Sequence, residues 1–71
     1  MTSPLVTDQI YKSLCASPTP EPCSAIQAQL EAVTGRFCSR WRVIECLEAL
    51  EADGLAEYIW VGWERWWRAK P

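Results

Sequence analysis

The stretch Gly54-Leu-Ala-Glu-Tyr-Ile-Trp-Val-Gly62-Trp-Glu-Arg-Trp-Trp-Arg68 decides the fold of this chain. Seven of its fifteen residues are β-branched or aromatic, the types that favour extended strands, and Gly62 stands between two runs rich in them. A glycine in that place is typical of a tight turn. The sequence therefore predicts an antiparallel hairpin with strands at residues 55–61 and 63–68.

This hairpin is expected to pack against other elements, because an isolated hairpin is only marginally stable in water. Side chains alternate between the two faces of a strand, so Trp63 and Trp67 share one face and Trp66 lies on the other. Aromatic residues on both faces cannot all enter one core. We expect Trp66 or Trp67 to pack the hairpin onto the first helix.

Upstream of the hairpin, residues 39–53 have the periodicity of a helix. Ser39 is of the type that caps a helix N-terminus, and Gly54 follows the end, where a glycine can adopt a positive φ. A short turn at residues 34–38 precedes this helix, as in a helix-turn-helix. The apolar positions expected to face inward are Val43, Ile44, Leu47 and Leu50.

A first helix is expected from Ser3, as a cap, and Pro4 to Ala16. Residues 17–22 follow, and their three prolines predict an extended connector. The inward stripe of this helix is Val6, Ile10 and Leu14, with Leu5 beside it.

A second helix is expected to begin near Pro22 or Ser24 and to end before Gly35. Ser24 and Gln27 have the spacing of a capping box, in which each side chain bonds the backbone of the other residue. The inward face is expected to contain Ile26, Leu30 and Val33.

The composition predicts one small domain spanning residues 1–71, with 49% hydrophobic residues and a net charge of −2. A negative net charge disfavours nonspecific coating of nucleic acid, although DNA binding depends on where the cations lie. The first residues have no basic and apolar pattern of a signal peptide, and no run is long enough to span a bilayer. We therefore expect a cytoplasmic protein without a membrane partner.

The four cysteines are Cys15, Cys23, Cys38 and Cys46. They form no Cys-x-x-Cys pair, and the chain has no histidine, so no zinc site is expected. A reducing compartment disfavours disulfides, which leaves small, mostly buried apolar side chains as the preferred interpretation. An alternative is a redox-sensing Cys38, because Arg36, Arg40 and a helix start nearby favour a thiolate.

The order helix, helix, turn, helix, hairpin resembles the winged helix-turn-helix domain of small bacterial transcription regulators of the MarR and PadR type. The similarity is clearest over residues 30–68. Its motifs are Leu47-Glu-Ala-Leu50-Glu-Ala-Asp-Gly54-Leu55 and Trp66-Trp67-Arg68. The resemblance implies an α+β fold: a three-helix winged helix-turn-helix with a C-terminal two-stranded antiparallel wing. The small winged helices of ferrous-iron transport are also similar, but their cysteines cluster in the wing, where this chain has none.

The resemblance implies a DNA-binding transcription regulator that acts as a dimer on double-stranded DNA. The N-terminal end of the third helix contacts base edges in such proteins, and the wing contacts the backbone. The candidate DNA-contact residues are Arg36, Ser39, Arg40, Arg42, Arg65 and Arg68. Glu45 and Glu48 on the same helix would repel phosphates unless they point away, so ordinary surface charge is the alternative for these arginines.

The five tryptophans exceed what so small a core needs, and exposed aromatic side chains are typical of protein interfaces. The alternative function is therefore a winged-helix protein-interaction module without DNA binding. Its candidate interface residues are Trp41, Trp60, Trp63 and Trp66. No histidine base, phosphate-binding loop or nucleophile motif occurs, so neither an enzyme nor a cofactor is expected.

Overall fold

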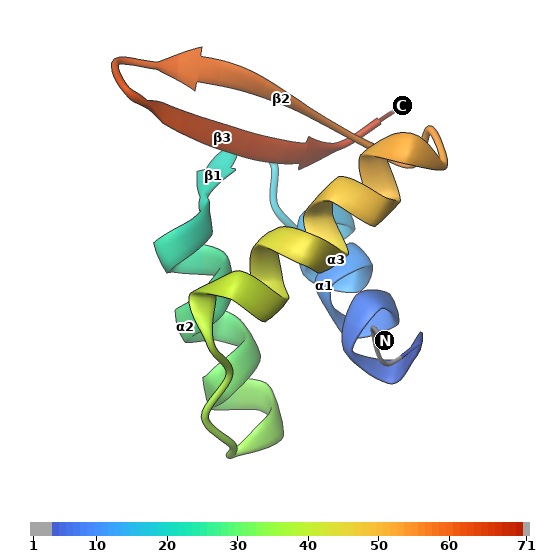
Figure 1. Ribbon diagram of the computed structural model, residues 1–71, viewed down its shortest axis with the longest axis vertical. Helices are drawn as coiled ribbons and strands as arrows, with labels where there is room; N and C mark the ends of the chain where they lie inside the picture. Colours follow the sequence, from blue (N-terminus) through green and yellow to red (C-terminus); the bar gives the residue numbers. More distant parts are fainter. Residues whose placement is uncertain (1–3, 71) are drawn as a thin grey trace.

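The computed structural model describes residues 4–70, which form an α+β fold with three helices beneath a three-stranded antiparallel sheet (Figure 1). The helices have 13, 12 and 13 residues, and none of those described is long and apolar enough to cross a bilayer. In chain order the elements are α1 (Pro4–Ala16), β1 (Glu21–Pro22), α2 (Cys23–Thr34), α3 (Arg40–Ala52), β2 (Ala56–Val61) and β3 (Glu64–Ala69).

The predicted hairpin is confirmed as β2 and β3, whose register runs without interruption from Ala56 opposite Ala69 to Val61 opposite Glu64. Gly62 and Trp63 form the two-residue connection. Gly62 has a φ of +63°, whereas no described residue other than glycine has a positive φ. A positive φ at the first central position alone is the pattern of a type II′ turn, whose twist suits a hairpin.

The sheet has a third strand, so the prediction of a two-stranded wing is corrected. Glu21 and Pro22 pair with Trp67 and Trp66 of β3. The proline-rich connector was expected to be extended, but its pairing was not expected, because proline lacks the donor that a ladder uses. The strand is possible because it lies at the sheet edge and has only two residues.

One cluster of buried side chains joins the helices to the sheet. It contains Ile10, Leu14, Ile26, Leu30, Cys38, Val43, Cys46, Leu47, Leu50, Ala56 and Trp67. Trp67 is the tryptophan that packs the hairpin onto the helices, and its ring lies 4.9 Å from that of Tyr58. β3 contacts α1, as expected for that packing. Leu5 lies at a position whose side chain is outside the described part.

The predicted caps of α3 are confirmed. The Ser39 hydroxyl accepts a hydrogen bond from the backbone N–H of Arg42 at 3.2 Å. At the other end, the N–H groups of Gly54 and Leu55 donate to the carbonyls of Glu51 and Leu50, both at 2.9 Å. These two bonds make a Schellman motif, which requires the φ of +76° that Gly54 adopts. The predicted cap Ser3 lies outside the described residues.

Two predictions for α2 are wrong. The helix begins at Cys23 with Pro22 as its N-cap and has no side-chain cap, so Ser24 and Gln27 form no capping box. Gln27 instead donates its side-chain N–H to the Cys38 carbonyl at 2.7 Å. Val33 was expected to face inward but is 62% exposed. The C-terminal end of α2 projects below the start of α3, where no element covers it (Figure 1).

Candidate functional site

The six residues predicted to contact DNA lie in three separate places. Arg36, Ser39 and Arg42 line an open groove of about 810 Å³ beside the turn between α2 and α3. Arg40 and Arg65 line a second, smaller hollow beneath the hairpin. Arg68 lies on β3, in an ion pair with Glu57 of β2. The structure therefore does not bring these cations together as one basic surface.

The hollow beneath the hairpin has a volume of about 260 Å³ and brings three tryptophans together. Its walls come from both strands of the hairpin, the start of α2 and the first half of α3. The lining residues are Cys23, Arg40, Ile44, Trp60, Trp63, Glu64, Arg65 and Trp67. The hollow thus combines a large aromatic surface with two guanidinium groups and one carboxylate.

Trp63 and Trp60 form the exposed part of this hollow. The turn at Gly62 holds Trp63 at the tip of the hairpin, where its side chain is 99% exposed. Trp60 stands opposite Arg65 across the strands and is 64% exposed. Its ring meets that of Tyr58 edge-on at 5.9 Å, a favoured arrangement of aromatic rings that holds the indole in place. Two large apolar side chains are therefore presented to solvent at one place.

Arg65 is held by contacts within the chain. Its guanidinium lies 5.2 Å from the ring centre of Tyr58 and 5.0 Å from that of Trp67. It also forms an ion pair with Glu48 of α3 at 3.6 Å. An ion pair at a half-exposed carboxylate contributes about 0–1 kcal/mol, and each cation–π contact contributes about 0.5–1 kcal/mol or more. Packing on the rings is therefore the larger of the two effects that position Arg65.

Arg40 differs from Arg65, because it is exposed and has no ion-pair partner among residues 4–70. It lies at the first position of α3, where the helix dipole also favours an anion. Burial raises the pKa of the nearby Cys23 thiol, and the charges of Arg40 and Arg65 only partly oppose this effect. The hollow therefore contains one unmatched cation and a thiol that stays protonated near neutral pH.

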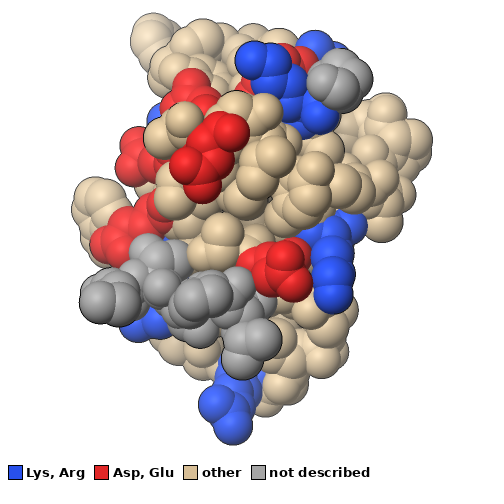
Figure 2. All heavy atoms as spheres, turned by 90° about the vertical axis from the view of Figure 1, so that its right-hand side faces the viewer, with Lys and Arg blue, Asp and Glu red and all other residues tan. Residues whose placement is uncertain are grey.

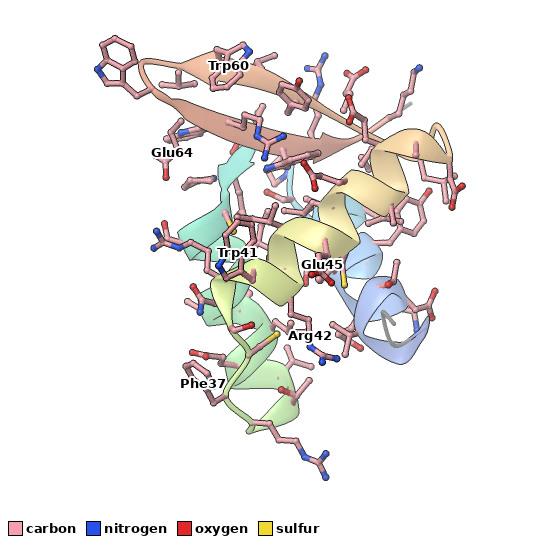
Figure 3. The ribbon with its side chains drawn as sticks, in the orientation of Figure 1. Phe37, Trp41, Arg42, Glu45, Trp60 and Glu64 are labelled. Carbon is pink, nitrogen blue, oxygen red and sulfur yellow. The ribbon has the colours of Figure 1, made fainter. Side chains whose placement is uncertain are left out.

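The most exposed stripe of α3 carries Trp41, Glu45 and Glu48. These residues follow one another at helical spacing on the side opposite the buried Val43 and Leu47, and all three are exposed. Trp41 and Glu45 face the viewer in Figure 3, whereas Arg42 points below the helix. A duplex that received this stripe would meet Glu45, which has no ion-pair partner among residues 4–70, and Glu48, which is paired with Arg65.

The face of the molecule shown in Figure 2 does not divide into a basic and an acidic half. In Figure 2 acidic side chains gather along the side that α3 occupies, and basic side chains lie between and beside acidic ones. Glu64 adds a carboxylate close to the tip of the hairpin, just below the ribbon in Figure 3. The elements expected to contact DNA therefore each carry acidic residues.

Of the four tryptophans predicted at an interface, only Trp60 and Trp63 come together. Trp41 is 75% exposed on α3 and does not line the hollow. Trp66 is partly buried on the other face of the hairpin, where its indole N–H is enclosed and has no hydrogen-bond partner within the described residues. The sequence did not indicate Cys23 as a lining residue, because the pairing of β1 with β3 brings the start of α2 beneath the hairpin.

The cysteines are all free thiols. Cys38 and Cys46 are buried, as expected, but Cys15 is exposed and Cys23 is only partly buried. Burial raises the pKa of the Cys38 thiol, which does not favour the reactive thiolate that neighbouring arginines suggested. The hydroxyl of Thr7 donates to the Cys46 sulfur at 3.5 Å. Within residues 4–70 no group of three His, Cys, Asp or Glu side chains is arranged to hold a metal ion.

Comparison with known proteins assigns no family to the chain: no family model matches it, and no curated protein matches it. Function must therefore be inferred from the side chains themselves. The hollow with Trp60 and Trp63 is the stronger candidate site, because two exposed indoles line it, whereas the groove beside Arg36 and Arg42 has one exposed aromatic side chain, Phe37.

Proposed function

We propose that this protein is a protein-binding module that holds a segment of its partner in the hollow beneath the hairpin. The observation that carries the proposal is the pair of exposed indoles, Trp63 and Trp60, on one wall of that hollow. Tryptophan is strongly enriched among the residues that dominate binding energy at protein interfaces. Two such side chains beside a hollow offer a place for a partner side chain to become fully desolvated.

The winged-helix scaffold is part of this proposal. Three helices followed by a hairpin, with α2 and α3 joined by the turn at residues 35–39, support it. Winged helices serve protein binding as well as DNA binding, so the scaffold alone decides neither. The acidic residues Glu45 and Glu48 on α3 favour the protein partner.

The chemistry of the hollow indicates what the partner segment contains. Indoles and Ile44 suit an aromatic or aliphatic side chain, and the unmatched Arg40 suits a carboxylate next to it. Glu64 lies in the same lining and disfavours a second partner anion there. We therefore propose that the protein binds a peptide segment with a large apolar residue next to an Asp or Glu.

The proposal is tested by selection of displayed random peptides on the immobilised protein, with the Trp60→Ala/Trp63→Ala double variant as counter-target. Enriched peptides are expected to contain a large apolar residue beside an acidic one. In calorimetric titrations with such a peptide, Trp63→Ala is expected to weaken binding about 30-fold, the loss typical of a central interface residue.

Trp41→Ala is the matched control, because it removes another exposed indole that does not line the hollow. Its affinity for the selected peptide is expected to stay within about twofold of the wild-type value, as for peripheral contacts. The proposal is abandoned if no peptide is enriched over the double variant, or if Trp41→Ala weakens binding as much as Trp63→Ala does.

Double-stranded DNA is the second candidate ligand, favoured by one observation. Arg36, Arg40 and Arg42 are exposed around the N-terminal end of α3, and none has an ion-pair partner in the described part of the chain. The discriminating measurement is fluorescence anisotropy with a random duplex at two salt concentrations. DNA binding predicts an affinity that falls steeply with salt, and a salt slope about two smaller for Arg40→Ala/Arg42→Ala. The protein-binding proposal expects no DNA complex in either condition.

A further inference from the structure

The two edges of the sheet differ in how they are protected against pairing with another strand. The strand order β1-β3-β2 places β1 at one edge and β2 at the other. β1 has two residues and lies in the segment 17–22, which contains three prolines. Short strands and prolines are the usual means of blocking an exposed edge. The β1 edge is therefore poorly suited to receive another strand.

The β2 edge has none of these protections. β2 has six residues, Ala-Glu-Tyr-Ile-Trp-Val, with no proline and no basic residue, and its register with β3 contains no bulge. The one charged side chain, Glu57, already forms an ion pair with Arg68. Figure 1 shows β2 at the rim of the molecule, on the side of the hairpin away from β1.

The backbone groups on the open side of β2 can be assigned from the hydrogen-bond pattern. The N–H of Lys70 donates to the carbonyl of Leu55 at 2.9 Å, so Leu55 directs its groups toward β3. Hydrogen-bonded and non-hydrogen-bonded pairs alternate along an antiparallel ladder. Ala56, Tyr58 and Trp60 therefore direct their N–H and C=O groups away from β3. Ala56 is buried, so the groups accessible to another strand are those of Tyr58 and Trp60. No hydrogen bond from elsewhere in residues 4–70 reaches these groups.

We propose that this edge pairs with the β2 edge of a second copy of the chain, so that two sheets become one antiparallel sheet of six strands. The register in which the accessible groups of both copies meet places Ile59 opposite Ile59 of the second copy. Tyr58 then faces Trp60, and Glu57 faces Val61, so no two like charges are opposed across the seam. The contact is isologous and closes after two copies.

Two side chains of β2 support a second copy of the chain as the partner of this edge. Ile59 and Val61 are half-exposed, although they lie on a strand that is rich in apolar residues. Pairing with a second copy covers part of both side chains and also gives hydrogen-bond partners to the outward backbone N–H and C=O groups of β2. The proposal goes beyond the protein-binding function and does not rest on it, because it uses the backbone of β2 and not the hollow.

The test is sedimentation of the full chain from about 1 μM to about 1 mM, the range of weak to moderate affinity. Wild type is expected to pass from monomer to dimer within this range. Trp60→Pro removes one outward N–H and none that bonds β3, and is expected to weaken the dimer at least about tenfold. Trp60→Ala loses the same indole but keeps the N–H, and Trp63→Ala leaves β2 intact, so both are expected to dimerise.

Residue-resolved amide exchange of the wild-type protein tests whether the β2 edge forms the dimer contact, even if Trp60→Pro does not fold. The amides of Tyr58 and Trp60 are expected to become protected as concentration rises, whereas those of Glu57 and Ile59 are protected throughout. The proposal is overturned if the chain stays monomeric at all concentrations. It is equally overturned if a dimer forms while the amides of Tyr58 and Trp60 stay unprotected, since another surface then makes the contact.

Discussion

Trp63 and Trp67 are the same amino acid four positions apart, yet one is fully exposed and the other buried. The difference arises from position along the hairpin. Trp67 lies where β3 crosses the helices and packs beside Tyr58, whereas Trp63 stands at the turn, beyond the helical body. The hydrophobicity of a residue therefore does not by itself decide whether its side chain is buried or exposed.

This contrast gives a matched prediction for stability. Trp67→Ala is expected to lower the free energy of unfolding by about 3–5 kcal/mol, because it removes a buried aromatic side chain and leaves a cavity. Trp63→Ala is expected to change it by less than about 0.5 kcal/mol, as for other exposed positions. Urea denaturation measures both. Equal losses in the two variants would show that Trp63 is not free at the hairpin tip.

At the scale of elements, the helix ends obey local rules with one exception. Ser39 caps α3 through its hydroxyl, and Gly54 ends the helix in a left-handed conformation. Ser24 has the same sequence pattern as a cap but is not used, because α2 begins one residue earlier, directly after the strand residue Pro22. The pairing of β1 with β3 thus determines where α2 starts.

The comparison of Ser39, which caps a helix, with Ser24, which does not, gives a second prediction for stability. Ser39→Ala is expected to destabilise the protein by about 1 kcal/mol, because the backbone N–H of Arg42 loses its acceptor at the helix start. Ser39→Asp retains an acceptor and is expected to restore most of that loss. Ser24→Ala is the control and is expected to be neutral. Thermal unfolding of the three variants checks the assignment, and a destabilised Ser24→Ala would contradict it.

At the scale of the whole molecule, three titrating groups share one direction of shift. Burial raises the pKa of the Cys23 and Cys38 thiols, and a hydrogen bond with Cys15 raises that of Tyr11. In each case the neutral form is favoured in the folded state. At alkaline pH the unfolded chain loses these protons first, so unfolding becomes easier as pH rises.

The stability of the protein is therefore expected to be constant around neutral pH and to decline as the pH rises above the ordinary thiol pKa of 9.0. Urea midpoints measured from pH 7 upward test this expectation. The Cys23→Ala/Cys38→Ala variant is expected to show a shallower decline, since two of the three groups are removed. An increase in stability from pH 8 to more alkaline pH would have the opposite sign and would show that the pKa values of these groups are not raised by folding.

The sequence by itself determined the three helices and the hairpin, because periodicity and capping act between residues a few positions apart. Val43, Leu47 and Leu50 indicate the α3 core face, and Gly62 indicates the hairpin turn, without reference to the rest of the chain. Only the tertiary structure decided that β1 pairs with β3, which tryptophans are buried and which arginines form ion pairs. Those depend on contacts between distant segments, such as Glu21 with Trp67 and Glu48 with Arg65, which local patterns do not encode.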